Sequence, residues 1–291
     1  MKNREEVVCG TCSRRCRLAE GAIGFCRARR AEGGRVVAAN YGRISSIALD
    51  PIEKKPLRRF HPGSYILSAG SYGCNLRCPF CQNYEISWSE QAYRMRSRAK
   101  EIMPDELAGI AESCRKDGNI GVAFTYNEPL ISYEYVRDTA RLLHEKGMAV
   151  VLVSNGMASK EVLSELAGSV DAMNIDLKGF TDRYYRDVLK GDRRMVMEFI
   201  EDAVKMCHVE LTTLIVPGEN DSDNEIRELA GWIAGLTNAD GNVIGRSIPL
   251  HISRFFPRFH MRDRGPTPVA QVYRLAEAAR EMLEYVYTGN C

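Results

Sequence analysis

The chain has 291 residues, of which 45% are hydrophobic and 27% charged, a composition typical of a globular protein with a large core. No apolar run approaches the roughly 20 residues of a membrane helix, and no signal peptide begins the chain, so we expect a cytoplasmic protein without membrane contact. A net charge of +2 argues against nucleic acid as a partner, although residues 1–60 carry 14 Lys and Arg against six Asp and Glu.

Residues 1–60 are predicted to form a small Cys-rich extension. Its cysteines are Cys9, Cys12, Cys16 and Cys26. Four thiolates close either a structural zinc site or a second iron–sulfur cluster. A small appendage with little core favours zinc as a staple. One or two short strands are expected around 36–47, and the charged, Pro- and Gly-punctuated passage 54–63 predicts a domain boundary near residue 60.

Residues 61–291 are predicted to form the core domain, in which apolar strand-like runs alternate with helical patterns. The six predicted strands are 65–70, 120–125, 149–154, 172–177, 210–216 and 248–254. The six predicted helices are 104–116, 133–146, 160–167, 195–206, 224–237 and 269–284. Repeated strand–helix units predict an α/β fold with parallel strands, in an open sheet or a barrel. Six units are two short of a complete TIM barrel, so we expect a partial (β/α)6 barrel.

A second group of cysteines directly follows the first of these strands. Cys74, Cys78 and Cys81 are separated by three and two residues, and Asn83 follows them. Three thiolates at this spacing can hold an iron–sulfur cube and leave its fourth iron without a protein ligand. An open iron can chelate a substrate or cofactor. The alternatives are a zinc knuckle or a structural cluster.

Polar residues close the later strands, where parallel barrels carry their active sites. They are Glu128, Ser154, Asn155, Asn174, Asp176, Lys178, His251 and Arg254. Asp176 and Lys178 share one face of the fourth strand. Each candidate also has a structural interpretation: Glu128 as an acid at a helix N-terminus, Asp176 with Lys178 as an internal salt bridge, and His251 as a core histidine.

The C-x3-C-x2-C spacing, with Phe80 before its last cysteine, resembles the signature of the radical SAM superfamily. The resemblance implies an open [4Fe-4S] cluster at Cys74, Cys78 and Cys81 that binds S-adenosylmethionine (SAM). Reductive cleavage of SAM then yields methionine and a 5′-deoxyadenosyl radical, which abstracts a hydrogen atom from a substrate.

The same resemblance implies contacts with SAM for several side chains. The implied cofactor-binding residues are Phe80, Asn83, Glu128, Ser154, Asn155, Asp176, Lys178 and His251. Phe80 would lie near the adenine, Glu128 at the methionyl amino group, and His251 at the adenine or ribose. The stretch around Asp176 and Lys178 is similar to pyruvate formate-lyase activating enzymes, in which the matching pair lies beside the SAM carboxylate. Tyr126 and Asn127 depart from the two glycines of relatives.

Longer stretches resemble the radical SAM member of the AmmeMemoRadiSam system, a family related to the pyruvate formate-lyase activating enzymes. They are 47–57, 74–87, 124–130, 251–256 and 285–290. This implies a flavodoxin- or ferredoxin-type electron donor and Memo-like and AMMECR-like partners, with the substrate left open. A rival reading is an activating enzyme for a glycyl radical enzyme, although many activators carry a cysteine insertion that this chain lacks. A non-catalytic, metal-stapled binding protein is the rival from another class.

Overall fold

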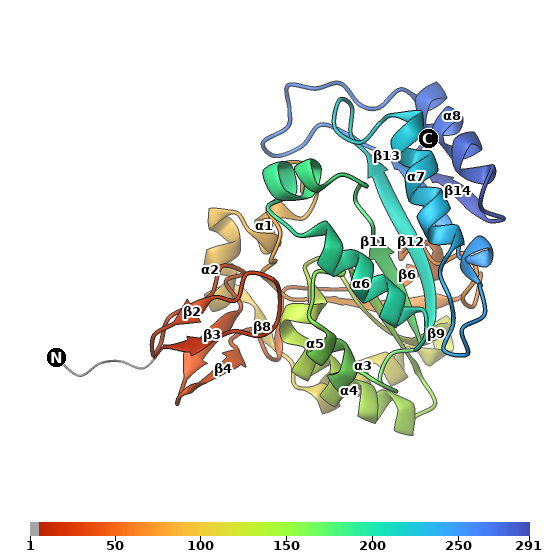
Figure 1. Cartoon of the computed structure of the whole chain (residues 1–291). Helices are drawn as coiled ribbons and strands as arrows, with labels where there is room; N and C mark the ends of the chain where they lie inside the picture. Colours follow the sequence, from red (N-terminus) through yellow and green to blue (C-terminus); the bar gives the residue numbers. More distant parts are fainter. Residues whose placement is uncertain (1–5) are drawn as a thin grey trace.

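The computed structural model describes residues 6–291 and is built around one curved, eight-stranded sheet (Figure 1). In spatial order its strands are β14 (Val286–Gly289), β13 (Leu250–Arg254), β12 (His208–Ile215), β11 (Ala172–Asp176), β10 (Ala149–Ser154), β9 (Asn119–Phe124), β7 (Tyr65–Gly70) and β6 (Ser46–Pro51). Every neighbouring pair is parallel except β6 with β7. The edge strands β6 and β14 do not pair with each other. The expected α/β fold with a partial barrel is therefore confirmed.

All six predicted strands are present, with ends within two residues of those expected. The sheet also contains β14, a seventh parallel strand that the sequence analysis did not list, and the antiparallel β6. The predicted boundary near residue 60 stays a prediction, but the sheet itself begins before it, because β6 pairs with β7 from Ser46 to Pro51.

Helices α3 (Pro104–Ser113), α4 (Tyr133–Glu145), α5 (Lys160–Glu165), α6 (Arg193–Ala203), α7 (Asp223–Ala234) and α8 (Val269–Arg280) cover the outer face of the sheet (Figure 1). Two further helices, α1 (Tyr84–Ser87) and α2 (Glu90–Arg98), lie apart from that face, on the side of the N-terminus. Each predicted helix is present, and α7 begins where the Ser222 side chain accepts a hydrogen bond from the Glu225 amide. Among the described residues, no helix combines the length and apolarity needed to cross a membrane.

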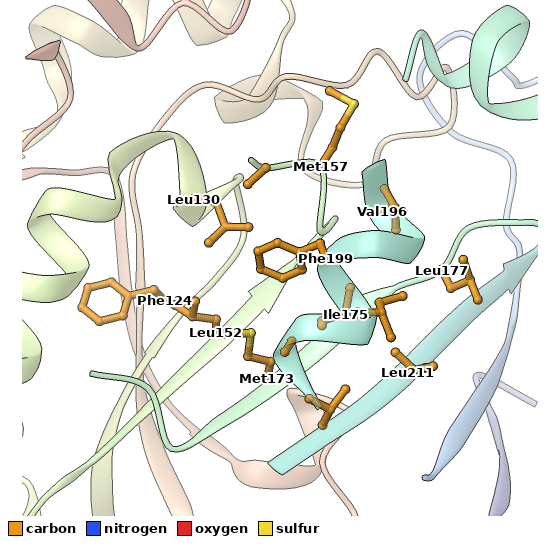
Figure 2. Packing of buried hydrophobic residues seen from close by; sticks show 14 of the residues in the cluster. Phe124, Leu130, Leu152, Met157, Met173, Ile175, Leu177, Val196, Phe199 and Leu211 are labelled. Carbon is orange, nitrogen blue, oxygen red and sulfur yellow. The ribbon is translucent and has the colours of Figure 1, made fainter. Parts of the chain in front are cut away.

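The main core lies between these helices and the outward-facing side chains of the strands. Figure 2 shows Phe199 of α6 beside Ile175 of β11, with Leu211 of β12 close by. Alternation along the strands explains this face, since Ile175 and Leu177 are fully buried in the core, while Asn174 and Asp176 point to the other side. Polar residues therefore line much of the inner face of the partial barrel near the carboxyl ends of the strands.

A strap formed by residues 52–60 fills the bottom of the barrel. Its Ile52 and Leu57 are fully buried against Ile66, Ala123 and Val151 of the strands. Backbone groups of the strap also form hydrogen bonds with inward-facing polar side chains. The Asn174 side chain, for example, donates from Nδ2 to the Pro56 carbonyl oxygen at 2.8 Å. The open mouth is therefore at the carboxyl ends of the strands.

The N-terminal residues form a small lobe beside the sheet, close to α2 (Figure 1). It contains the antiparallel pairs β1 (Val7–Val8) with β2 (Arg17–Leu18) and β3 (Arg29–Glu32) with β4 (Arg35–Ala38). A third short pair, β5 (Arg43–Ile44) with β8 (Lys100–Glu101), ties the lobe to the chain that follows α2. The buried Arg29 guanidinium anchors the lobe to α4 through an ion pair with Glu134 at 2.7 Å.

Candidate active site

A cavity of about 520 Å³ opens at the carboxyl ends of the strands, the size of a small-molecule site. Its walls combine residues more than 200 positions apart in the chain. Those predicted from the sequence that line it are Cys74, Cys78, Phe80, Cys81, Asn83, Glu128, Ser154, Asn155, Asp176, Lys178 and Arg254. The structure therefore brings together almost the whole predicted set.

The three cysteines of the second group stand on the loop that follows β7. Cys74 is held by its backbone amide, which donates to the Cys26 carbonyl oxygen at 3.2 Å, and the Cys81 amide donates to the Cys78 carbonyl oxygen. Burial raises the pKa of Cys78 to about 12 and also raises those of Cys74 and Cys81. A buried thiol of this kind becomes a thiolate when a metal binds it, so the donor set fits an iron–sulfur cluster.

Gly73 lets this loop pass close to the N-terminal lobe. Its φ is +93°, and an added Cβ would lie 2.7 Å from the Cys26 carbonyl oxygen and 3.0 Å from the Ala28 Cβ. Only glycine adopts that conformation in that space without strain. The backbone conformation and the lack of space therefore require glycine directly before Cys74.

Tyr126 and Asn127 stand where the family resemblance implies two glycines, and Tyr126 has a backbone conformation that glycine adopts most readily. Tyr126 has a φ of +71°, and its hydroxyl donates to Asp50 at 2.9 Å. The Asn127 side chain accepts from the Ser71 amide at 2.8 Å and donates to the Gly73 carbonyl oxygen at 3.2 Å. The end of β9 thereby holds the cysteine loop in place.

Glu128 is buried in the cavity wall, where it accepts three hydrogen bonds. They come from the Ser154 hydroxyl at 2.7 Å, the Asn155 amide at 2.8 Å and the Leu130 amide at 2.9 Å. Burial raises the pKa of Glu128 to about 7, although these hydrogen bonds lower it. Glu128 also caps the short 3₁₀ helix Pro129–Ser132, as its structural interpretation expects, while its contact with a methionyl amino group stays a prediction.

Ser154 and Asn155 connect Glu128 to the cysteine loop. The Asn155 side chain donates to Asn75 Oδ1 at 2.9 Å and approaches Cys74 Sγ at 3.6 Å. Asn75 itself donates to the Met157 carbonyl oxygen at 2.7 Å. The ends of β9 and β10 and the loop after β7 thus form one hydrogen-bonded unit.

Asp176 and Lys178 form a salt bridge of 2.9 Å in the cavity wall. Burial alone would lower the pKa of Lys178, but the neighbouring Asp176 outweighs it and the pKa rises. The internal salt bridge and the position in the cavity are therefore both present. The Lys178 ammonium group and the Asp176 carboxylate thus belong to the wall of the same cavity as Cys74, Cys78 and Cys81.

Phe80, which lies between the second and third cysteines of the motif, and residues from the end of β13 also line the cavity. Phe80 meets Phe255 edge to face with 6.2 Å between ring centroids. The Arg254 Nε donates to the Thr267 carbonyl oxygen at 2.7 Å. Asn83, on the cysteine side, donates to the Tyr126 carbonyl oxygen at 2.8 Å. The cavity lining thus combines aromatic rings with hydrogen-bonding groups.

Of the predicted residues at the strand ends, Asn174 and His251 lie outside the residues lining this cavity. His251 sits deeper in the barrel, where its Nε2 lies 2.6 Å from Glu210 Oε2 and its ring stacks on Tyr287. Glu210 also accepts from the backbone amides of Arg58 and Arg59 in the strap. In the structure His251 therefore contacts the barrel floor, as the core-histidine interpretation expects.

The four cysteines of the N-terminal lobe line a second, small cavity of about 10 Å³, about the size of one water molecule. Cys9, Cys12 and Cys26 are buried, and the Cys9 amide donates to the Cys16 carbonyl oxygen at 2.9 Å. In residues 6–291, no three His, Cys, Asp or Glu side chains are already gathered around the position of one metal ion. Metal binding at either cysteine group would therefore require their side chains to adjust.

Several cavity residues were not among the predicted site residues. They are Leu76, Gln82, Ser87, Thr125, Tyr126, Asn127, Val153, Thr212, Leu214, Ser253, Phe255, Phe256, Arg258 and Asn290. Thr212 and Leu214 occupy the inward positions of β12, which strict alternation would have identified. Asn290 follows β14, so recognising that strand would have placed it at the same edge as the others.

Comparison with known proteins gives a consistent family. The model of the radical SAM superfamily matches residues 69–230, more than half of the chain. A Methanocaldococcus jannaschii protein described as uncharacterized is 38% identical over 292 residues, covering 98% of this chain and 81% of that protein. The pyruvate formate-lyase 1-activating enzyme of Escherichia coli is 25% identical over 174 residues, covering 58% of this chain and 68% of that enzyme.

Solved structures add a likeness of fold. Streptococcus suis SuiB bound to S-adenosylmethionine has a TM-score of 0.57 at 14% identity, covering 76% of this chain and 48% of that protein. At this identity the match concerns the arrangement of strands and helices alone.

Proposed function

Because the chain belongs to the radical SAM superfamily, we propose that it cleaves S-adenosylmethionine reductively at a [4Fe-4S] cluster held by Cys74, Cys78 and Cys81. When bound, such a cluster supplies one electron to the sulfonium, so that SAM divides into methionine and a 5′-deoxyadenosyl radical that abstracts hydrogen from the substrate. The observation that carries the proposal is the shared cavity: three thiols, a buried carboxylate and the Asp176–Lys178 pair line one space.

The surrounding residues fit the two ends of a bound SAM. Glu128 Oε2 accepts one hydrogen bond and retains a lone pair for the methionyl amino group, while Lys178 offers a cation to the carboxylate. Ser154 and Asn155 hold the Glu128 carboxylate in place. Phe80, with Asn83 nearby on the same loop, is proposed to contact the adenine.

Within the superfamily, we propose membership of the AmmeMemoRadiSam group, with Memo-like and AMMECR-like proteins as partners. A flavodoxin or ferredoxin is the proposed reductant. The proposed location is the cytoplasm, because seven of the ten cysteines fall into two groups with metal-ligand spacing, and a reducing compartment keeps such thiols available for metals. For the four N-terminal cysteines we propose zinc, since a small lobe with little core of its own is stabilised by a structural metal.

A second candidate function is activation of a glycyl radical enzyme. It is favoured by relatives whose names describe activating enzymes, including the 4-hydroxyphenylacetate decarboxylase activating enzyme of Clostridioides difficile, 22% identical over 161 residues. That match covers 54% of this chain and 51% of that enzyme. Formation of a glycyl radical in a partner enzyme, observed by electron paramagnetic resonance, would select this candidate.

The test is anaerobic reconstitution of the full chain with iron and sulfide, followed by reduction with dithionite and addition of SAM. We expect 5′-deoxyadenosine from the wild type, none from Cys74→Ala, and wild-type amounts from Cys114→Ala, whose thiol lies outside both cysteine groups. No product from a fully loaded wild-type cluster would contradict the proposal and favour a non-catalytic, metal-stapled binding protein.

A further inference from the structure

An open groove of about 630 Å³ lies on the outer side of the cysteine loop, where the N-terminal lobe meets the core. It is lined by Arg14, Phe25, Arg77, Pro79, Trp88, Asp187, Val188, Lys190, Glu219 and Met261. Pro79 lies within the cysteine motif, between Cys78 and Cys81. The groove is thus separated from the proposed cluster by the loop that holds it.

The groove carries three cations without an acidic partner. Arg14, Arg77 and Lys190 form no ion pair with a carboxylate in residues 6–291. Arg14 donates instead to the carbonyl oxygens of Asn75 and Lys190, and Arg77 donates to those of Cys74, Leu76 and Phe25. A guanidinium group keeps its charge at neutral pH, so Arg14 and Arg77 both add positive charge to the groove.

The two acids of the groove are already neutralised. Asp187 pairs with Arg186 at 2.8 Å, and Glu219 pairs with Arg264 at 2.8 Å and Arg183 at 3.4 Å. The surface that remains is therefore positive. Of its three cations, Arg14 belongs to the basic N-terminal stretch 1–60, while Arg77 and Lys190 come from the core.

Aromatic rings give the groove an apolar centre. Phe25 is 36% exposed, and the guanidinium groups of Arg14 and Arg77 lie 3.4 and 3.7 Å from its ring centroid. Trp88 lies beside Arg77, at 5.6 Å. An aromatic centre with arginines around it is the composition of protein–protein binding surfaces.

The groove also contacts the backbone of the proposed cluster ligands. Arg77 Nη1 donates to the Cys74 carbonyl oxygen at 2.8 Å, and the Trp88 indole donates to the Cys78 carbonyl oxygen at 3.2 Å. A redox group brought to this surface would therefore lie one side-chain layer from the cysteines. The cavity for SAM opens on the inner side of the same loop, so both faces are usable at once.

We propose that this groove docks an acidic electron-donor protein, whose carboxylates meet Arg14, Arg77 and Lys190 while its redox group faces Phe25 and Trp88. The proposal rests on the proposed function, since it supplies the electron that SAM cleavage consumes. One electron leaves the reduced flavin or iron–sulfur centre of the donor and reduces the cluster by one electron. The positive surface speeds the encounter and fixes its orientation.

The experiment compares two reductants on the reconstituted full-length enzyme: a bacterial flavodoxin kept in its hydroquinone state, and dithionite. Lys190→Glu places an acid in the groove at an exposed position, and Lys190→Gln removes only the charge. Lys116→Glu is the matched control, because it makes the same exposed reversal just before β9, at the opposite end of the strands. Formation of 5′-deoxyadenosine is measured against flavodoxin concentration.

We expect Lys190→Glu to raise the half-saturating flavodoxin concentration at least about fivefold, and Lys190→Gln to raise it less. Raising the salt concentration from about 50 to about 300 mM should bring the half-saturating flavodoxin concentrations of Lys190→Glu and wild type closer together, because salt screens the charges. Rates with dithionite should be unchanged in all three variants. Equal flavodoxin curves for Lys190→Glu and Lys116→Glu would overturn the docking surface while leaving the proposed function intact. Absence of product from wild type with dithionite would overturn the proposed function itself.

Discussion

The conformation of the cysteine loop requires a residue without a side chain at Gly73. Gly73→Ala would force a residue with a Cβ into a φ of +93°, with a backbone oxygen 2.7 Å from that carbon. The conformation alone costs an alanine about 1–2 kcal/mol, and the contact adds to it. We expect the free energy of unfolding to fall by more than about 2 kcal/mol in denaturant titrations, with reduced iron uptake.

Gly109 provides the control for this substitution. It lies inside α3, at a negative φ, with no atom within 4 Å of an added Cβ. Gly109→Ala should leave iron uptake unchanged and stabilise the protein by up to about 1 kcal/mol, because alanine favours the helix. Equal stability of the two variants would contradict the role assigned to Gly73.

Glu210 makes the stability of the barrel floor dependent on pH. Burial alone would raise its pKa, but hydrogen bonds from His208, His251 and the amides of Arg58 and Arg59 outweigh it and lower the pKa to about 2. A depressed pKa means stability that is present above the unfolded value of 4.5 and lost as pH falls through 2. The shift corresponds to about 3 kcal/mol at neutral pH.

Glu210→Gln should therefore lower the free energy of unfolding at pH 7. At about pH 3 the loss relative to wild type should be less than half of the loss at pH 7. Urea unfolding of both proteins across this range measures it. A difference that stays constant from neutral to acidic pH would show that packing, and not the ionised carboxylate, is responsible.

Single site residues could be predicted from the sequence where a residue type suited to a particular chemistry stands at the end of a strand. The three cysteines of the loop after β7, Glu128 and Asp176 lie at or just after the carboxyl ends of strands that meet at one edge, and all of them line the cavity. His251 is different because alternation along a strand predicts which face a side chain occupies but not its depth in the barrel. Its hydrogen-bond partner Glu210 lies 41 residues earlier in the sequence, and no local pattern around either residue predicts that the two meet.

Among the elements, six of the seven parallel strands were predicted to within two residues, because apolar runs of six or so residues alternate regularly with helices. The strap 52–60 was not predicted as a floor, since its charged and Pro-containing sequence is typical of a linker. Lys55 nevertheless is 3% exposed and pairs with Asp50 at 2.8 Å, and the Arg58 and Arg59 amides bond to Glu210 some 150 residues away. Such long-range contacts leave no periodic trace in the sequence.

The connection between β13 and α8 forms one wall of the cavity and is closed at its base by Thr267. The Thr267 hydroxyl donates to the Ile215 carbonyl oxygen at 2.7 Å and accepts from the Phe255 amide at 3.2 Å. Thr267→Val keeps the shape but leaves two buried backbone groups unpaired, at a cost of about 2 kcal/mol. We expect faster hydrogen exchange across 256–266 and a lower melting temperature.

Thr267→Ser keeps the hydroxyl and loses only a methyl group, so it should retain the protection of this segment. The comparison separates hydrogen bonding from packing at one position. If both variants exchange as slowly as wild type, the base of the loop does not depend on Thr267.

Across the whole molecule, the N-terminal lobe and the core meet at the cysteine loop. The Cys26 carbonyl oxygen accepts from the Cys74 amide, and the Arg29–Glu134 ion pair lies beside this contact in the interface. Burial raises the pKa of Cys26 to about 11, while the amides of Ala28 and Arg29 counter it by bonding to the sulfur. Order in the lobe is thus coupled to order in the loop.

Metal content tests this coupling. With zinc in the lobe, the protein should bind one zinc per chain besides the iron of one cluster, and Cys9→Ala should lose the zinc. Because the loosened lobe no longer fixes Cys74, iron uptake should also fall, whereas Cys114→Ala should retain both metals. Elemental analysis with Mössbauer spectroscopy measures each metal. Doubled iron without zinc would assign a second cluster to the lobe instead, and unchanged iron in Cys9→Ala would refute the coupling.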